Sequence, residues 1–446
     1  MKISSRAGFR TGIALLAVTA TLTGCATAGA RTELRVKVVL SGETYRKLCV
    51  VVAVAVFSSN FANYSERWGY KPLYWVGLLG VLTAPLLAGA ALTKRVPIRP
   101  LMVWCAGFLL ISIAWYFPSK QNAIAYQEVE TRFLSVIFLL LVLFLCARPA
   151  EQHLARVMIA LSVLLGVGLN LYEVFHPLTF SKIPGRSSGL FENSNQSGAA
   201  LILGMIIAYA VVPSRLRLPF IVLTGIGILT TFSRAAMIGW ILVVLLLVVR
   251  AGFGVRQARA LLVFGAIVVA FIFSPLWGNV QGSLEERGIL NLNNLQRLTF
   301  FRQGNLDDQS AEGRKQVAQV GWRLFGEKPL AGHGTGSFRV IEDLQAGVHN
   351  IYVALLIDHG ILGLFIIPSL LLATLWGANA KTFDVVGPFM LFIAMWGFFS
   401  HNVLEERYIL LSIALTAALV AGARTRPMES RAAEPKLAPL GAVASA

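Results

Sequence analysis

Charged residues are scarce in this sequence. Asp, Glu, Lys and Arg make up 14% of its 446 residues, whereas 56% are hydrophobic, and a soluble domain of ordinary composition carries about 25% charged residues. The mean hydropathy is +0.69, and apolar stretches recur from Leu48 nearly to the C-terminus. Many approach the roughly 20 residues that a transmembrane helix needs. Because an open sheet edge cannot be satisfied in lipid, the sequence predicts an all-α membrane protein.

Cysteines and metal-binding motifs are also scarce. The four cysteines lie in or beside apolar segments and show no C-x-x-C spacing, which argues against a disulfide framework or a metal site. There is no acidic motif of the Asp-x-Asp type, and the Gly-rich stretch 332–338 lacks the Gly-Lys-Ser/Thr ending of a P-loop. The cysteines are Cys25, Cys49, Cys105 and Cys146.

Acidic residues are fewer than basic ones, which gives a net charge of +17. In a soluble protein this excess would suggest nucleic acid, but here many Lys and Arg residues fall in alternate short loops, where they indicate cytoplasmic loops and lipid headgroup contacts. We therefore expect membrane lipids and no nucleic acid as partners. The intervening loops mix their signs and are expected to face outward; examples are Glu66 with Arg67, Glu128 and Glu130 with Arg132, and Glu405 and Glu406 with Arg407.

The hydropathy pattern divides the chain into five parts. They are an N-terminal leader-like and cytoplasmic segment (1–47), transmembrane helices 1–9 (48–275), a periplasmic loop subdomain with its own helices (276–349), transmembrane helices 10–12 (350–423) and a disordered cytoplasmic tail (424–446). The twelve predicted spans are 48–64, 72–92, 100–117, 132–147, 154–173, 198–212, 218–232, 235–250, 259–275, 350–376, 386–401 and 408–423.

The first 30 residues resemble a secretion leader that ends in Leu-Thr-Gly-Cys25, a sequence similar to a lipoprotein processing site. Cleavage there would place the basic segment 31–47 outside and invert the predicted topology. The sequence therefore leaves three outcomes for this leader: it is retained, cleaved, or lipidated at Cys25.

The predicted outward loop after the fifth span is rich in amides and turn formers. It reads KIPGRSSGLFENSNQSG over residues 182–198 and contains Arg186 and Asn195. Asn193 or Ser194 can cap the following helix, and a helix N-terminus beside a guanidinium is a natural phosphate site. The alternative is an ordinary capped turn with an interfacial arginine.

A second arginine lies at the predicted outer end of the next hairpin. Arg234 follows Ser233 between two long apolar runs. An arginine costs about 2.5 kcal/mol or more at the centre of a membrane helix and less near the interface, so its presence here indicates function. Snorkelling to a lipid headgroup is the alternative.

The long loop contains an amphipathic pattern. Apolar residues recur at helical spacing between Ser310 and Gly326, which predicts a helix that lies on the membrane surface. Ser310 is its expected N-cap, Gly326 and Pro329 its expected stop, and Arg314 falls in its first turns.

Three histidines and one asparagine lie in the long loop or at the predicted outer ends of the late spans. A histidine at a helix mouth can accept a proton near neutral pH, although a lone histidine is more often a satisfied interfacial residue. Asp358 and His359 lie deeper, where ionisable residues usually face the bundle interior and pair. The residues at the loop and mouths are His333, His349, Asn350 and His401.

Together these stretches resemble the O-antigen ligase and O-antigen polymerase superfamily. The resemblance implies a GT-C-like membrane fold with about 12 transmembrane helices and one large periplasmic loop that carries helices. It also implies glycan transfer from undecaprenyl diphosphate without a metal or other cofactor. It rests on Arg186 to Gly198, Ser233-Arg234, Gly313-Arg314, Pro329 to Phe338, and His349-Asn350 through Gly363.

The resemblance also implies roles for single residues. Arg186 and Arg234 would bind the diphosphate, Arg314 would assist from the loop, and His349 would position or deprotonate the acceptor hydroxyl. Supporting roles are expected for Asn193, Asn195, Ser233, Asn350, His333 and His401.

The expected activity is that of an O-antigen ligase, which joins the glycan to a lipid A-core sugar at the periplasmic face of the bacterial inner membrane. An O-antigen or exopolysaccharide polymerase, which uses a second lipid-linked repeat unit as acceptor, is the alternative. A transporter of the same lipid-linked glycan is a third possibility, but a carrier should place its polar residues near the membrane midplane.

Overall fold

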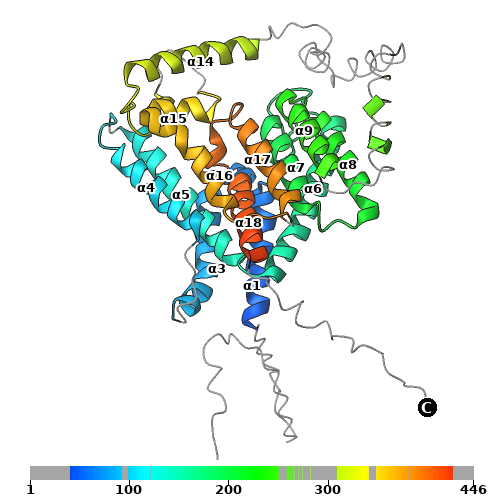
Figure 1. Cartoon of the computed structure of the whole chain (residues 1–446). Helices are drawn as coiled ribbons and strands as arrows, with labels where there is room; N and C mark the ends of the chain where they lie inside the picture. Colours follow the sequence, from blue (N-terminus) through cyan, green and yellow to red (C-terminus); the bar gives the residue numbers. More distant parts are fainter. Residues whose placement is uncertain are drawn as a thin grey trace, which may run out of the picture.

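The computed structural model describes residues 41–92, 99–120, 122–250, 309–340, 348–380 and 382–424, with a few isolated residues between 259 and 282. These residues are largely helical and form no strand, which confirms the all-α prediction. The elements (Figure 1) are α1 (Gly42–Ser58), α2 (Phe61–Tyr64), η1 (Ser65–Trp68), α3 (Pro72–Leu92), α4 (Pro100–Ala114), α5 (Ala123–Leu145), α6 (Pro149–Phe175), η2 (Gly189–Phe191), α7 (Ser194–Ala208), η3 (Ser214–Leu216), α8 (Arg217–Leu229), α9 (Arg234–Arg250), α14 (Gln309–Glu327), η4 (Ser337–Arg339), α15 (Ile351–His359), η5 (Gly360–Phe365), α16 (Ile366–Leu375), α17 (Phe383–Trp396), η6 (Asn402–Leu404) and α18 (Arg407–Arg424).

Several helices begin where the sequence supplies a suitable first residue. Pro100 and Pro149 occupy the first position of α4 and α6, where the missing N–H costs no hydrogen bond. Asn122, Asn193 and Asn350 precede α5, α7 and α15, and each side chain accepts a backbone N–H of the first turn. The predicted cap at Asn193 is thereby confirmed.

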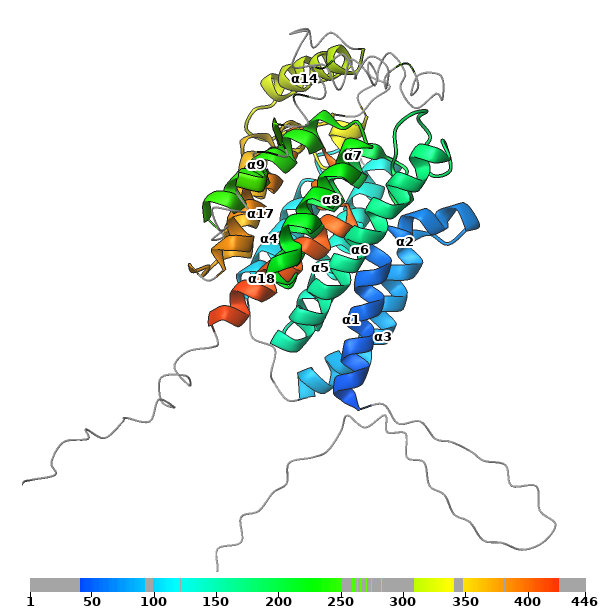
Figure 2. The ribbon, with the colours of Figure 1, turned by 90° about the vertical axis from the view of Figure 1, so that its right-hand side faces the viewer.

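Helices α7 and α18 form the centre of the bundle. Nearly every residue of α7 is buried, and its neighbours include α6, α8, α9, α17 and α18. Figure 2 shows these helices running side by side, with α14 lying across one end. Because α7 is covered on all sides, its sequence is apolar all around rather than amphipathic.

Three helical segments of the described chain are long and apolar enough to cross a membrane, and a fourth qualifies if the bent pair Gly42–Ser58 and Phe61–Trp68 is counted as one span. Other apolar helices are shorter. The prediction of twelve spans therefore remains a prediction, and the predicted span 259–275 lies largely outside the described residues, as do the leader with Cys25 and the tail after 424. The three segments are Pro72–Leu92, Pro149–Phe175 and Ile351–Leu375.

The predicted span 350–376 is broken in the middle. Gly360 has a φ of +61°, and the chain continues as the 3-10 segment η5 before α16 begins. The break frees carbonyl groups at the end of α15. The N–H of His333 donates to the carbonyl of Ile357 (2.8 Å), and the N–H of Gly334 donates to that of Asp358 (3.0 Å). The segment 329–334 thus supplies the hydrogen bonds that the broken helix lost, as buried backbone requires.

The loop helix α14 differs from its prediction in one contact and one boundary. Its apolar side packs on α15: Val317 is 3% exposed, and a Cβ on Gly321 would lie 2.5 Å from Val353. The apolar face is therefore covered by protein, not only by membrane. The helix begins at Gln309, so Ser310 lies inside it and is not its N-cap, whereas the end at Glu327 agrees with the predicted stop.

Helix α5 begins nine residues before the predicted span at 132. Glu128 and Arg132, which the charge pattern assigned to an outward loop, are buried residues of this helix. The prediction was wrong because the two charges neutralise each other one helical turn apart, which hydropathy alone does not register.

Candidate functional site

The loop between α6 and η2 is folded around one buried carboxylate. Oε1 of Glu173 accepts the backbone N–H groups of Phe180 (2.9 Å) and Ser181, and Oε2 accepts those of Ser188 (2.7 Å) and Gly189 (3.2 Å). The Glu173 residue is 3% exposed. Four charge-assisted hydrogen bonds from one side chain fix both ends of the loop that carries Arg186.

The guanidinium of Arg186 links this loop to its neighbours. Its Nε donates to the carbonyl of Thr231 (3.0 Å), and its Nη2 donates to Oδ1 of Asn195 (3.1 Å). The backbone N–H of Ser187 also donates to the carbonyl of Thr230 (3.0 Å). The loop, the start of α7 and the turn between α8 and α9 therefore form one unit.

Arg234 is the first residue of α9 and lies in the same turn. The hydroxyl of the buried Ser233 accepts the backbone N–H of Ala236 (3.4 Å), as a helix cap does. Phe232, at φ +48°, makes the sharp turn that precedes the helix. Because Arg186 bonds the carbonyl of Thr231, the two arginines predicted to bind diphosphate belong to adjoining segments.

Contacts of the segment between η6 and α18 connect the arginine unit to the loop before α15. Gln196, in the first turn of α7, donates its amide N–H to Oε1 of Glu406. Glu405 accepts a hydrogen bond from Nη2 of Arg339, whose Nε lies 2.7 Å from Oε2 of Glu128. Residues from four distant parts of the sequence therefore meet at this end of the bundle.

The two carboxyl groups of this segment titrate near neutral pH. Burial and the neighbouring Glu405 carboxyl raise the pKa of Glu406 to about 7, although Arg407 opposes the shift. Burial and Glu128 likewise raise the pKa of Glu405 to about 7 against the effect of Arg339. Their ionisation is therefore sensitive to pH in the physiological range.

Two predicted histidines lie together. The ring centroids of His349 and His401 are 5.5 Å apart, and the ring of Phe338 lies 5.9 Å from that of His401. Burial, His349 and Arg339 lower the pKa of His401 to about 4, so His401 is neutral at pH 7. Within the described part of the chain its buried Nδ1 has no hydrogen-bond partner.

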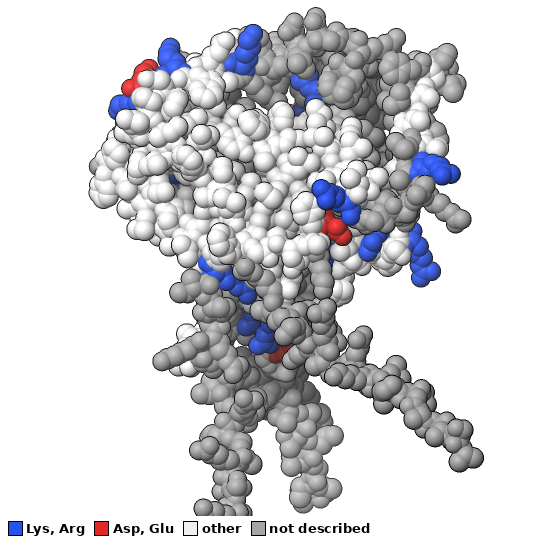
Figure 3. Space-filling view, viewed as in Figure 1, with Lys and Arg blue, Asp and Glu red and all other residues white. Residues whose placement is uncertain are grey.

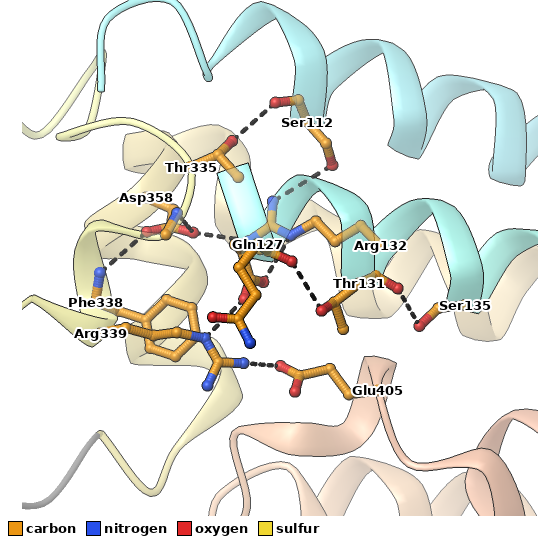
Figure 4. A network of polar contacts seen from close by, with 12 residues as sticks. Ser112, Gln127, Thr131, Arg132, Ser135, Thr335, Phe338, Arg339, Asp358 and Glu405 are labelled. Carbon is orange, nitrogen blue, oxygen red and sulfur yellow. Dashed lines mark hydrogen bonds and ion pairs between the residues drawn. The ribbon is translucent and has the colours of Figure 1, made fainter. Parts of the chain in front are cut away.

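A buried charge network is centred on Arg132 (Figure 4). Arg132 donates hydrogen bonds to Oε1 of Glu128 (2.9 Å), Oδ2 of Asp358 (2.7 Å) and Nε2 of His359 (2.8 Å). Its Nη1 also lies 3.4 Å from the hydroxyl of Ser112. Arg132 is 3% exposed, whereas Asp358 and His359 are both 0% exposed. The prediction that Asp358 and His359 face the interior and pair is confirmed.

Asp358 extends this network to the Gly-rich loop. Its two carboxylate oxygens accept the backbone N–H groups of Gly336 (2.9 Å) and Phe338 (3.2 Å), and the hydroxyl of Thr335 donates to the carbonyl of Ser112 (2.9 Å). The loop is held on both sides by buried groups (Figure 4). The position of Phe338 against His401 follows from this attachment.

The remaining predicted residues have structural contacts or lie outside the description. His333 donates its Nε2–H to the carbonyl of Leu324 (2.8 Å), near the end of α14. Asn350 caps α15. Arg314 lies in the second turn of α14, but its side chain is not among the described ones.

Sequence reasoning missed the residues that hold the site together. They were assigned to mixed-charge loops or not considered, although the i, i+4 spacing of Glu128 and Arg132 beside an apolar run is a signal for a paired helix face. No local pattern identified the others, because their partners are distant in sequence. They are Glu128, Arg132, Glu173, Gln196, Arg339, Glu405 and Glu406.

Part of the chain matches a known family model. Residues 219–367 match the family model described as O-antigen ligase, which confirms the resemblance to the O-antigen ligase and polymerase superfamily. The matched range includes Arg234, Arg314 and His349, whereas Arg186 and His401 lie outside it. No curated protein matches the chain.

Proposed function

We propose that this chain, with its O-antigen ligase domain at 219–367, transfers a glycan from undecaprenyl diphosphate to a lipid A-core sugar. The reaction takes place at the periplasmic face of the inner membrane and needs no metal ion. The observation that carries the proposal is that Arg186 donates a hydrogen bond to the carbonyl of Thr231, in the turn that leads into Arg234. This turn lies near the start of the region that matches the family.

The arginine pair supplies the chemistry for the donor. A guanidinium offers two parallel N–H groups that match phosphate oxygens, and it stays charged throughout the reaction. Arg234 also begins α9, and the N-terminus of a helix favours a bound anion. Arg186 and Arg234 would therefore neutralise the diphosphate as it leaves, and the side chain of Arg314 would assist from α14.

The histidine pair supplies the chemistry for the acceptor. His349 would position the acceptor hydroxyl or take its proton as the new glycosidic bond forms. His401 is neutral at pH 7 and lies beside it, so the pair carries no fixed positive charge from His401 that would disfavour proton uptake. The supporting roles of Asn195 and Ser233 are to hold Arg186 and the turn before Arg234.

The test is reconstitution of the purified full chain in proteoliposomes with an undecaprenyl-diphosphate-linked glycan and lipid A-core. A ligase consumes the carrier-linked glycan and forms glycosylated lipid A-core, with no longer chains on the carrier. His349→Ala should lower turnover sharply and leave donor binding nearly unchanged, because this residue acts on the hydroxyl.

The alternatives give different products. A polymerase lengthens the glycan on the carrier and leaves lipid A-core untouched, which would make the acceptor assignment wrong. If neither product forms but the labelled glycan crosses the bilayer, the chain is a transporter and not an enzyme.

A further inference from the structure

A cavity lies beneath α14, away from the arginine pair. It has a volume of about 280 Å³ and is bounded by α14, by the chain around residues 118–125 and by the Gly-rich loop 333–340. A water molecule occupies about 30 Å³ in the liquid. The cavity is therefore large enough for a small anionic group together with several waters.

The residues that line this cavity carry positive charge. Lys120, Arg323 and Lys328 contribute three cations, and His333 adds a ring fixed by its bond to the carbonyl of Leu324. No Asp or Glu is among the described lining residues. The carboxylate of Glu327, whose side chain is 53% exposed, lies at the edge of this group, 4.0 Å from Nε2 of His333. Figure 3 shows Lys and Arg side chains over α14 at the upper edge of the molecule, with an acidic side chain beside them.

The cavity is separate from the arginine pair, since neither Arg186 nor Arg234 lines it. Gly336 and Ser337 line the cavity, while Phe338, the next residue, contacts His401. Helices α14 and α15 lie at one side of the molecule, and α7, α8 and α9 lie at the other (Figure 1). A phosphate in the cavity would therefore belong to a different group from the diphosphate at Arg186.

We propose that this cavity, defined by Lys120, Arg323, Lys328 and His333, is a second phosphate site that binds a phosphate group of the acceptor. The proposal rests on the proposed function for the identity of the acceptor. Three cations around one cavity, against the single exposed carboxylate of Glu327 at its edge, favour an anionic ligand such as a phosphate ester. The phosphate would be a monoester on the core sugars in a ligase, or the diphosphate of the second carrier lipid in a polymerase.

A binding experiment tests the site without requiring turnover. The probe is a deacylated lipid A-core oligosaccharide, used before and after removal of its phosphate groups, and its Kd for the full chain in phosphatidylcholine nanodiscs is measured at several salt concentrations. The wild type should bind the phosphorylated probe more tightly. Lys120→Gln with Lys328→Gln should weaken that binding about tenfold or more, since hydrogen bonds to charged groups contribute about 1.5–3 kcal/mol each, and should not change binding of the dephosphorylated probe.

Matched variants separate the site from general charge effects. The arginine double variant, Lys120→Arg with Lys328→Arg, should retain binding, and Lys71→Gln, an exposed lysine outside the cavity, should behave as wild type. Equal binding of both probes by the wild type, or equal loss in Lys71→Gln, would overturn the proposal. Two further measurements test other sources of the phosphate group, namely lipid headgroups and the carrier diphosphate. The Kd is measured in nanodiscs with and without phosphatidylglycerol, and during a titration with undecaprenyl diphosphate. A Kd change upon adding anionic lipid that is abolished in the glutamine variant would assign the cavity to lipid headgroups instead.

Kinetics distinguish failure of this site from failure of the proposed function. With phosphorylated acceptor, the glutamine variant should raise the KM for the acceptor about tenfold and leave the KM for the donor unchanged. If transfer occurs normally in the variant, the phosphate site is wrong and the proposed function stands. If no transfer occurs with any acceptor but the binding difference persists, the site stands and the proposed function is wrong.

Discussion

The arginine that begins α9, Arg234, is the residue proposed to bind the donor diphosphate together with Arg186. We predict that Arg234→Ala abolishes glycan transfer, with a loss of at least about a hundredfold, while membrane insertion and amount of protein stay unchanged. Arg234→Lys should recover only part of the activity, because lysine is a point charge without the planar pair of N–H groups. Transfer is measured with labelled donor in membranes that contain equal amounts of each variant.

A suitable control is Arg215→Ala, which removes an exposed arginine from the short η3 segment. It should leave transfer unchanged. Near wild-type transfer in Arg234→Ala would remove this residue from the donor site.

The buried Glu406 carboxyl makes stability depend on pH. Its pKa of about 7 in the folded chain lies above the ordinary value of 4.5 for glutamate, so the folded state binds more protons than the unfolded state between these values. This contribution is fully present below about pH 4.5 and is lost as pH rises through 7. Glu406→Gln should therefore reduce the fall in apparent Tm between pH 5 and pH 7, roughly by half because Glu405 contributes similarly.

The control for this measurement is Glu66→Gln at an exposed site on η1. It should keep the wild-type slope of Tm against pH. An unchanged slope in Glu406→Gln would mean that this carboxyl is not protonated near pH 7 in the folded chain.

At the residue scale the sequence identified candidate functional groups but not the residues that support them. Arg186, Arg234 and His349 were identifiable because a charge or a histidine at an apolar helix end is costly or unusual. The partner of each could not be read from local spacing. Arg132 and Asp358 are 226 residues apart in sequence, yet their side chains are 2.7 Å apart.

At the scale of the element, Glu173 at the end of α6 shapes the loop that presents Arg186. We predict that Glu173→Gln lowers stability by about 3 kcal/mol, since glutamine leaves some of the four buried N–H groups unpaired. The apparent Tm should fall by roughly 5 °C or more, and the affinity for undecaprenyl diphosphate should fall with it.

The contrast with Arg186→Ala distinguishes the loop from the ligand contact. That variant removes two hydrogen bonds, whereas Glu173→Gln affects four, so it should lower Tm less and lose more donor affinity. Glu130→Gln, on an exposed position of α5, should change neither. If Glu173→Gln retains wild-type Tm and donor binding, the carboxylate does not hold the loop.

Element boundaries were predictable where hydropathy and caps agree. The span 72–92 coincides with α3, and Asn193 was identified as a cap. The break at Gly360 was not predicted, because hydropathy does not distinguish a continuous helix from a broken one. Only the packed structure reveals why it is stable: a Cβ at Gly360 would lie 2.5 Å from the carbonyl oxygen of Leu330, so only glycine permits the segment 329–334 to approach.

At the scale of the whole molecule, the site is an assembly of segments that chain order keeps apart. The α6–α7 loop, the α8–α9 turn, the Gly-rich loop and the segment before α18 are joined at one end of the bundle by Arg186, Gln196, Arg339 and the His349–His401 pair. The sequence predicted that these segments would share the outer face, through alternation of basic loops. Which loops touch depends on the packing of α7 and α18 at the centre, which no periodicity specifies.

The last prediction concerns which end of this bundle faces the periplasm. The basic loop residues predict that the segment around Arg215 is cytoplasmic and that the loop around Lys182 lies outside. Lys182 is 76% exposed and so accessible to a reagent. In a chain whose native cysteines are replaced by alanine, Lys182→Cys should react with a membrane-impermeant maleimide in intact spheroplasts, and Arg215→Cys should react only after the membrane is opened. Both variants should retain transfer, which shows that the labelled molecules are the active ones. The reverse labelling pattern would place the arginine pair and the histidines in the cytoplasm, where an acceptor on the outer leaflet could not reach them, and the ligase proposal would fail together with the topology.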